Sequence, residues 1–357
     1  SAPVERRLDA FGDALPELGA PKHMAVQINR ALHDLLAQHQ NALVFGEDVA
    51  KKGGVYHLTA GLLERFGAGR VFNTLLDEQT ILGLAQGFAS VGLLPVPEIQ
   101  YLAYVHNALD QLRGEACSLQ FFSRDQFRNP MVVRIASFAY QKGFGGHFHN
   151  DNSIAALRDI PALIIAAPSR GDDAVRMLRS CFAAAQTSGR VVAFLEPIAR
   201  YMTRDLHEDG DGLWATSYPP PGDALPIGRG TVYGENNSDL CIISYANGVW
   251  LSLRAARQLE REHGIAARVV DLRWLAPLDE KLVVEQARAC RRVLIVDEGR
   301  RSGGLAEPLL AAIALAGEHP PLARVVGEDT FIPLGPAADT VLPTEQSIVQ
   351  TALDLCR

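Results

Sequence analysis

Two patterns of apolar residues alternate along this chain, and the alternation predicts its fold class. Continuous apolar runs of about four to eight residues are typical of buried strands, whereas apolar residues recurring every three or four positions are typical of one helix face. The helical pattern MAVQINRALHDLLAQ (24–38), for example, is followed by the extended run ALVFGED (42–48). Because helices that connect parallel strands produce this alternation, we predict an α/β chain with mostly parallel sheets flanked by helices.

The predicted elements form two sets, separated by a polar, proline-rich segment. Residues 203–225 contain HEDGDG and the triple proline 219–221, which neither a helix nor a central strand accommodates. We therefore predict an N-terminal extension or linker (1–21), a first domain (22–202), an interdomain linker (203–225) and a second domain (226–357). Strands are predicted at 42–48, 71–76, 95–100, 131–137, 162–168, 191–197, 239–245, 266–272, 292–298 and 323–329, and helices at 24–38, 58–67, 78–91, 104–121, 171–186, 249–264, 279–290 and from about 304.

Composition narrows the class of protein. The chain has 357 residues, of which 48% are hydrophobic and 21% charged, and its net charge of -7 argues against a nucleic-acid partner. The five cysteines are far apart and form no CxxC pair, so neither a disulfide framework nor a metal site is indicated. No apolar run approaches the roughly 20 residues of a membrane span. We expect a protein that is not secreted and works in the cytoplasm, or in the mitochondrial matrix if it is eukaryotic.

The stretch NTLLDEQTILGLAQG (73–87) places two carboxylates between a predicted strand and a predicted helix. Asp77 and Glu78 precede an apolar run in which Gly83 and Gly87 share one helix face. Capping and interaction with the helix dipole explain such carboxylates without any further function. A catalytic role for one of the two carboxylates is the alternative.

Two further stretches carry candidate chemistry. In QKGFGGHFHNDNS (141–153), His147 and His149 alternate within a glycine-rich loop, and histidine is the side chain best suited to move protons near neutral pH. On an extended loop both would point the same way, and solvated loop histidines are the alternative. Gln100 ends a predicted strand and Tyr104 lies just beyond it, at the kind of position where α/β sheets bind ligands, although packing in the core also explains the tyrosine.

The sequence contains no complete phosphate-binding motif of a known type. The sequence contains neither GxGxxG nor a Walker A motif. The spacing of GDG (210–212) and the asparagines 236–237 is close to that of a thiamine diphosphate motif, but LWATSYPPPGDALP follows the glycines and cannot form the helix that this motif requires. We expect no metal site in this chain.

Taken together, these motifs indicate a family. The segment from GEDVAKKGGVYHLT through VPEIQYLAYVHNALDQ, with GGHFHNDN, FLEP, VVDLRWLAPLD, DEGRRSGGLAEPL and EDTFIPLG in this order, resembles the β subunit of the thiamine diphosphate-dependent 2-oxo acid dehydrogenases, which are transketolase-like enzymes. The resemblance covers nearly the whole chain from about Lys22. It implies a pyrimidine-binding domain, a transketolase C-terminal domain, and oxidative decarboxylation of a 2-oxo acid with acyl transfer to a lipoyl group.

The resemblance assigns roles position by position. Glu78 matches the glutamate that hydrogen-bonds the cofactor's aminopyrimidine ring, and Leu76, Gln100 and Tyr104 match residues that line the pyrimidine pocket. His149 matches a histidine that assists proton transfer and acyl transfer. Glu47 matches an acidic residue proposed to relay protons. Asp77 stands where relatives often have a small neutral residue, so the resemblance assigns it no role. The sequence departs from the family's loop after His149, which leaves the role of the cluster 150–152 open.

The resemblance also implies partners. The magnesium and diphosphate site belongs to an α subunit, or to an α half of the same polypeptide, so this chain is expected to work only with that partner. A second β copy and a lipoyl acyltransferase core are the other expected partners. The serine at position 1 and the polar residues 1–21 are compatible with a fused α–β chain. The alternatives are another transketolase-like thiamine enzyme and a noncatalytic subunit that docks the acyltransferase core.

Overall fold

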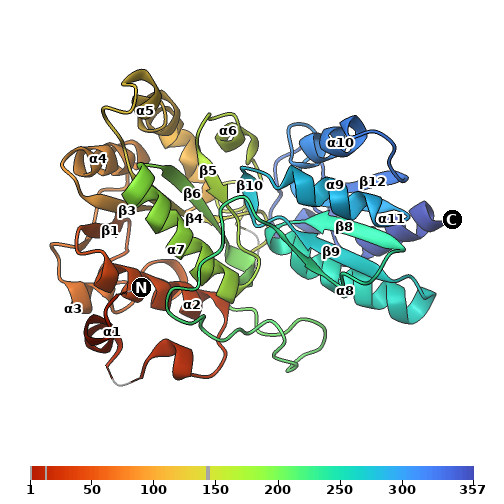
Figure 1. The fold of residues 1–357 in the computed structure, drawn as a ribbon, viewed down its shortest axis with the longest axis horizontal. Helices are drawn as coiled ribbons and strands as arrows, with labels where there is room; N and C mark the ends of the chain where they lie inside the picture. Colours follow the sequence, from red (N-terminus) through yellow and green to blue (C-terminus); the bar gives the residue numbers. More distant parts are fainter. Residues whose placement is uncertain (1, 13, 142–144) are drawn as a thin grey trace.

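Two mostly parallel sheets form the framework of the chain (Figure 1). In the computed structural model, which describes residues 2–12, 14–141 and 145–357, one sheet has seven strands in the order β10-β5-β6-β4-β3-β1-β2 and the other has five in the order β12-β11-β8-β9-β7. Only β10 with β5 and β7 with β9 pair antiparallel in these sheets. The predicted fold class is therefore confirmed. The strands are β1 (Ala42–Gly46), β2 (Val71–Asn73), β3 (Leu94–Ile99), β4 (Met131–Ser137), β5 (Ile164–Ala166), β6 (Val191–Pro197), β7 (Thr231–Tyr233), β8 (Leu240–Ser244), β9 (Ala267–Asp271), β10 (Trp274–Ala276), β11 (Val293–Arg300) and β12 (Leu322–Gly327).

Helices cover both faces of each sheet. One face of the first sheet packs on α2 and α7, and its other face packs on α4. In the second sheet, α8 and α11 lie on one face and α9 and α10 on the other. The α-helices are α1 (Val4–Phe11), α2 (Met24–Gln38), α3 (Leu62–Phe66), α4 (Glu78–Ser90), α5 (Leu119–Phe122), α6 (Ala155–Arg158), α7 (Gly171–Ser188), α8 (Ala246–His263), α9 (Glu280–Arg288), α10 (Ala306–Leu315) and α11 (Glu345–Cys356). Shorter turns are the 3-10 helices η1 (Pro16–Leu18), η2 (Val55–His57), η3 (Leu102–Ala108), η5 (Ile198–Arg200) and η6 (Gly335–Thr340), and the π-helix η4 (Gln111–Ala116).

Strand β4 shows why the strand sequences are continuously apolar. Successive residues of a strand point to opposite faces, so Val132 packs towards α2 and α7, whereas Met131 and Val133 pack towards α4. Every residue of β4 is buried, because helices cover both faces of the sheet.

The second half of the chain contributes to the core of the first. β10 leaves the second unit and pairs with β5, where Trp274 lies opposite Ala166. The Trp274 side chain is fully buried in the cluster that contains α2 and α7. A further cluster is continuous between Val133 of the first sheet and Ile243 of the second. The two units therefore share hydrophobic cores.

One predicted helix, residues 104–121, is wrong. The chain instead forms η3, η4 and α5, which are 3-10, π and α segments in succession. In η3 the buried residues Leu102, Val105 and Ala108 recur every third position. A 3-10 helix has about three residues per turn, so this spacing buries all three residues on one side, which an α-helix would not do as well.

Several elements have no counterpart in the predicted pattern: α1, β7, β10 and α11. The segment predicted as an extension contains α1, which is anchored through the buried Arg7. Its guanidinium bonds Glu17 at 2.6 Å and Asp34 at 2.8 Å. α11 begins with a capping box in which Thr344 and Ser347 exchange hydrogen bonds.

Residues 203–225 contain neither helix nor strand, in agreement with the sequence pattern. The segment is nevertheless anchored, because Trp214 and Tyr218 are buried and the Tyr218 hydroxyl donates to Asp34 at 3.1 Å. Among the described residues, no helix combines the length and the apolar character that crossing a membrane requires.

We expect Trp274→Ala to lower the free energy of unfolding by about 3–5 kcal/mol, because it leaves a cavity in the core of the first sheet. Urea titration measures the loss. Leu315→Ala is the control: Leu315 is 87% exposed, and its removal should change stability by less than about 0.5 kcal/mol. Equal effects of the two substitutions would mean that β10 contributes little to the first unit.

Candidate active site

The carboxyl ends of β1, β2 and β3 lie side by side and define the candidate site. Gly46 at the end of β1 is in register with Asn73 of β2 and with Glu98 of β3. The residues that follow these strands therefore gather at one edge of the sheet, where open α/β sheets bind their ligands. Glu47 follows β1, the segment containing Glu78 follows β2, and Gln100 follows β3.

Glu78 is the first residue of α4 and is only 5% exposed. The Asn107 amide donates to its Oε2 at 3.2 Å. Asp77 is the N-cap residue but makes no side-chain cap hydrogen bond, and its carboxylate instead accepts from the Thr80 hydroxyl. Glu78 therefore has a specific side-chain partner in addition to its place at the helix N-terminus.

A second buried carboxylate lies close to the first. Glu47 is 8% exposed, and its Oε1 is buried without a hydrogen-bond partner among the described residues. Burial raises the pKa of Glu47, and the charges of Glu78 and Asp48 raise it further. A buried polar atom without a partner is costly, so this pair is suited to hold a proton or to receive a polar ligand.

Close to Glu47, one buried guanidinium bonds two buried carboxylates on the neighbouring strands. Arg134 on β4 donates to Glu98 on β3 at 2.8 Å and to Glu196 on β6 at 2.8 and 3.0 Å. The Tyr201 hydroxyl also donates to Glu196, at 2.6 Å. Burial raises the pKa of Glu98 to about 7 although Arg134 opposes the shift. Sequence reasoning missed this network. The feature of the sequence that could have revealed it is a single charged residue in each of the apolar runs PVPEIQ, MVVRIAS and VVAFLEP.

An aromatic group containing His149 lies at the same edge. The His149 ring packs edge-on against Tyr101 at a centroid distance of 4.8 Å, and its Nε2 lies 3.5 Å from the Tyr104 hydroxyl oxygen. Burial raises the pKa of Tyr104, and the charges of Tyr101, Glu47 and Glu78 raise it further, which links the aromatic group to the acidic pair. The structure thus brings together Glu47, Glu78, Tyr104 and His149.

The two loop histidines point to different surroundings, contrary to the expectation for an extended loop. Residues 147–149 form a turn in which the His149 N–H donates to the Gly146 carbonyl at 3.0 Å. His147 packs instead against Phe148 and Phe331, at centroid distances of 4.1 and 5.3 Å. Residues 142–144 of the predicted glycine-rich loop lie outside the described residues.

Two of the predicted pocket residues are less enclosed than Glu78. Gln100 is half-buried, and Leu76 is 78% exposed. Among the described residues, little therefore covers Leu76, and this side of the site is open to solvent in the single chain.

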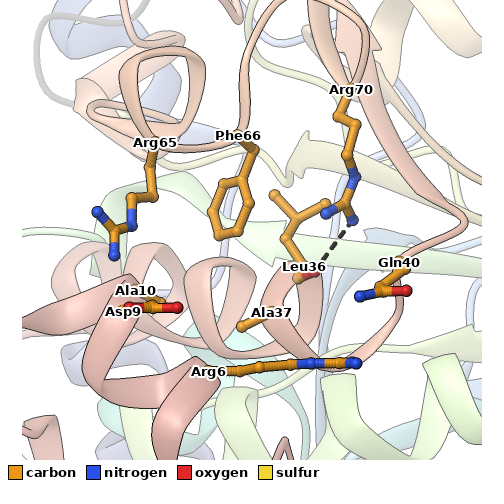
Figure 2. Close-up of a pocket in the computed structure, with 9 residues that line it drawn as sticks. All are labelled: Arg6, Asp9, Ala10, Leu36, Ala37, Gln40, Arg65, Phe66 and Arg70. Atoms are coloured by element: carbon orange, nitrogen blue, oxygen red, sulfur yellow. Dashed lines mark hydrogen bonds between the residues drawn. The ribbon is translucent and has the colours of Figure 1, made fainter.

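A cavity of about 500 Å³ lies apart from this group, between α1, α2 and the region of α3 (Figure 2). None of the predicted site residues lines it. Its Arg70 donates to the Leu36 carbonyl at 3.0 Å and to the His39 carbonyl at 2.7 Å. These contacts satisfy carbonyls at the end of α2, which is a structural role. The cavity is lined by Arg6, Asp9, Ala10, Leu36, Ala37, Gln40, Arg65, Phe66 and Arg70.

The GDG sequence at 210–212 is not followed by a helix, as expected. The Asp211 carboxylate accepts the backbone N–H groups of Leu206, His207, Glu208 and Leu213 at 2.7 to 3.0 Å, so it closes a local turn. The described residues include no group of three or more His, Cys, Asp or Glu side chains suited to hold a metal ion.

Comparison with known proteins agrees with this fold. Residues 21–202 match the family described as transketolase, pyrimidine binding domain, and residues 228–348 match transketolase, C-terminal domain. The solved structure "Split gene transketolase, inactive beta4 tetramer" aligns with a TM-score of 0.72 at 23% identity, covering 95% of this chain and 100% of that chain.

Similar proteins indicate which family of transketolase-like proteins the chain belongs to. The 3-methyl-2-oxobutanoate dehydrogenase subunit beta of Mycobacterium tuberculosis is 36% identical over 314 residues, which cover 87% of this chain and 85% of the relative. The pyruvate dehydrogenase E1 component subunit beta of Staphylococcus epidermidis is 34% identical over 337 residues, which cover 92% of this chain and 97% of the relative.

The fold and the matched domains define a transketolase-like α/β protein. Within that class, the chain belongs to the family of β subunits of the pyruvate and branched-chain 2-oxo acid dehydrogenases. The resemblance inferred from the sequence motifs is therefore confirmed.

The acidic pair predicts that Glu78→Gln stabilises the protein at high pH. Because folding raises the pKa of Glu47, ionisation of this carboxyl group destabilises the folded state. Its contribution to stability is therefore present below its unfolded pKa and is lost as pH rises through its folded pKa. Removing the charge of Glu78 lowers that pKa and reduces the loss, while the glutamine oxygen still accepts from Asn107.

Urea titration at pH 8 should show a gain of about 0.5–1 kcal/mol, limited by solvent screening at the edge of the sheet. At about pH 3.5, below the ordinary pKa of a glutamate, the gain should disappear. Glu64→Gln, which changes an exposed carboxylate on α3, is the control and should give no gain at either pH. A destabilised Glu78→Gln at pH 8 would contradict the proposed repulsion.

Proposed function

We propose that this chain is the β component of a 2-oxo acid dehydrogenase. It acts with an α subunit, or an α half, to decarboxylate a 2-oxo acid such as pyruvate or a branched-chain acid, and it passes the acyl group to a lipoyl group. The lipoyl disulfide is reduced as it takes the acyl group, so the two electrons left when carbon dioxide departs end on sulfur. The observation that carries the proposal is a buried Glu78 at the start of α4, beside Glu47 and an aromatic group with His149, in a chain of this family.

The residues present fit the aminopyrimidine side of thiamine diphosphate. This ring carries both hydrogen-bond donors and acceptors, and the site offers an unpartnered buried oxygen of Glu47 and a carboxylate of Glu78. Asn107 contacts only one of the two Glu78 oxygens among the described residues, so the other is available to the ring. When bound, the cofactor supplies the carbanion chemistry that releases carbon dioxide.

In this proposal, Glu78 would hydrogen-bond the aminopyrimidine ring and share a proton with it. Its position suits that task, because it is buried at the start of α4 and its Oε2 is held by the Asn107 amide. Glu47 is a second buried carboxyl group whose pKa the charge of Glu78 raises, and this raised pKa suits a proton relay. Asn107 orients Glu78 by donating to its Oε2.

Tyr104, Gln100 and Leu76 would form the walls of the pyrimidine pocket. Tyr104 would stack on the ring, and it is held by Tyr101, whose ring lies edge-on at a centroid distance of 5.5 Å. The exposed Leu76 supports a pocket that a second chain completes. Leu75 beside it is 77% exposed, which also favours a covering partner.

His149 would assist proton transfer at the substrate and acyl transfer to the lipoyl sulfur. It is half-buried, and its Nε2 lies within reach of the Tyr104 hydroxyl. Imidazole accepts and donates protons near neutral pH, as both steps require.

The expected partners follow from the same proposal. The α subunit or α half would hold the magnesium ion and the diphosphate, and the described residues include no group of three or more His, Cys, Asp or Glu side chains suited to a metal ion. A second β copy would complete an α2β2-type assembly, and a lipoyl acyltransferase core would receive the acyl group. The named relatives are bacterial, which favours a cytoplasmic protein.

We expect Glu78→Gln to lower lipoyl acylation by about 10²–10⁴-fold, because a proton-transferring group is lost. The assay uses the complex with its α partner and a panel of 2-oxo acids. Unfolding is followed in parallel, so that a loss of activity without a loss of stability identifies a chemical role. Near-wild-type turnover by a folded variant would contradict the role of Glu78.

We expect His149→Ala to reduce overall acyl transfer far more than His147→Ala, because only His149 contacts Tyr101 and Tyr104. Decarboxylation with an artificial electron acceptor, which needs no lipoyl group, separates the two steps. If His149 serves mainly acyl transfer, this partial reaction retains more activity than the lipoyl assay. Equal losses in the two variants would mean that the turn acts as a unit or that His147 has the role.

A further inference from the structure

Three polar residues that follow His149 are buried. Asn150, Asp151 and Asn152 are 1%, 6% and 3% exposed. Buried amides and carboxylates are retained where they have hydrogen-bond partners, so their partners indicate what they do. The sequence departs from the family's loop at these positions, and the proposed function gives them no role.

The Asp151 carboxylate joins three segments of the chain. Its Oδ1 accepts the Ser153 N–H at 3.1 Å and lies 3.6 Å from the Arg300 guanidinium at the end of β11. Its Oδ2 accepts from the Ser153 hydroxyl and lies 3.4 Å from the Nε2 of His106 in η3. Burial by itself raises the pKa of Asp151, but the hydrogen bonds from His106 and Ser153 outweigh burial and lower it. The group is therefore an ionised link between η3 and β11.

The two neighbouring asparagines fix the same loop at its ends. The Asn152 amide donates to the carbonyl of Glu298 on β11 at 2.6 Å. Asn150 donates to the Ala139 carbonyl after β4 and accepts the Gly145 N–H at 2.8 Å. The turn with His149 is thus held between the end of the first sheet and the second sheet.

Asp151 also lies in the wall of a cleft of about 810 Å³ between the two units. His106, Ser153 and Arg300 line the same cleft. His106 and Tyr104 both belong to η3, so the link through Asp151 connects the loop of His149 to the element that carries its ring partner.

We propose that Asp151 is a positioning residue for His149. By joining η3 to β11 it keeps the turn in the place where the imidazole contacts Tyr101 and Tyr104. The second unit thereby sets the reactivity of a residue in the first. This inference rests on the proposed function of His149, and it adds a group that acts through His149 without touching substrate.

A double-mutant cycle tests the link in the complex with its α partner. Asp151→Ala in the wild-type background should lower lipoyl acylation by about 10–100-fold, as loss of a group that orients a catalytic residue does. In the His149→Ala background the same substitution should cost less than about threefold, because the residue through which it acts is already absent. An equal loss in both backgrounds, or no loss in the wild-type background, would overturn the proposal.

Two further variants keep the cycle interpretable. Asp151→Asn preserves the size of the side chain and removes its charge, so it replaces Asp151→Ala if the alanine variant does not fold, with the same expected non-additivity. Ser302→Ala is the matched control. Ser302 lines the same cleft, but its hydroxyl donates to Asp329 at 2.7 Å and not to Asp151, so the loss of this hydroxyl should leave acylation unchanged.

NMR of histidine-labelled chain separates failure of this inference from failure of the proposed function. The His149 signals are identified by their loss in His149→Ala. Asp151→Ala should shift them, and Ser302→Ala should not. A shift in a chain that, with its partner, decarboxylates no 2-oxo acid would refute the proposed function but retain the positioning role. Unmoved His149 signals in a folded Asp151→Ala chain would refute the positioning role itself.

Discussion

A single buried guanidinium makes the candidate site possible. Arg134 lies at the centre of the first sheet, and without it the carboxylates of Glu98 and Glu196 would be buried without a counter-charge. Removing one partner of such a group costs about 3–5 kcal/mol, so the three strands that carry these residues depend on one another. The acidic pair of Glu47 and Glu78 lies at the same end of these strands. The ion pairs of Arg134 thus stabilise buried carboxylates next to the acidic pair, in a sheet that is otherwise apolar.

The site also depends on the way in which the two units are joined. β10 and Trp274 bind the second half of the chain to the sheet of the first, and a continuous apolar cluster runs between the two sheets. Asp151 and Asn152 attach the His149 turn to β11 across this junction. A rigid junction matters because catalytic geometry tolerates little displacement, and an error of about 1 Å can cost about 100-fold in rate.

The fold class was largely predictable from the sequence because strands and helices buried on known faces leave a periodic pattern. α2 spans the residues that its pattern predicts, and so do β4 and β6. The predicted helix 104–121 failed because its apolar spacing of three suits a 3-10 turn, which helical patterns do not distinguish well. β10 escaped notice because a strand of three residues has too short a pattern.

For the site, the sequence by itself determined the chemical groups, which are two carboxylates at the start of a helix and a histidine in a glycine-rich loop. The order of the motifs also identified the family. Only the tertiary structure decided which of them meet. Strand register places Glu47 beside Glu78, and a turn separates His147 from His149. It also gave partners to Arg134 and Asp151, whose contacts lie far away in the chain. The physical reason is that periodicity records which face of an element is buried, whereas contacts between elements depend on packing that no local pattern contains.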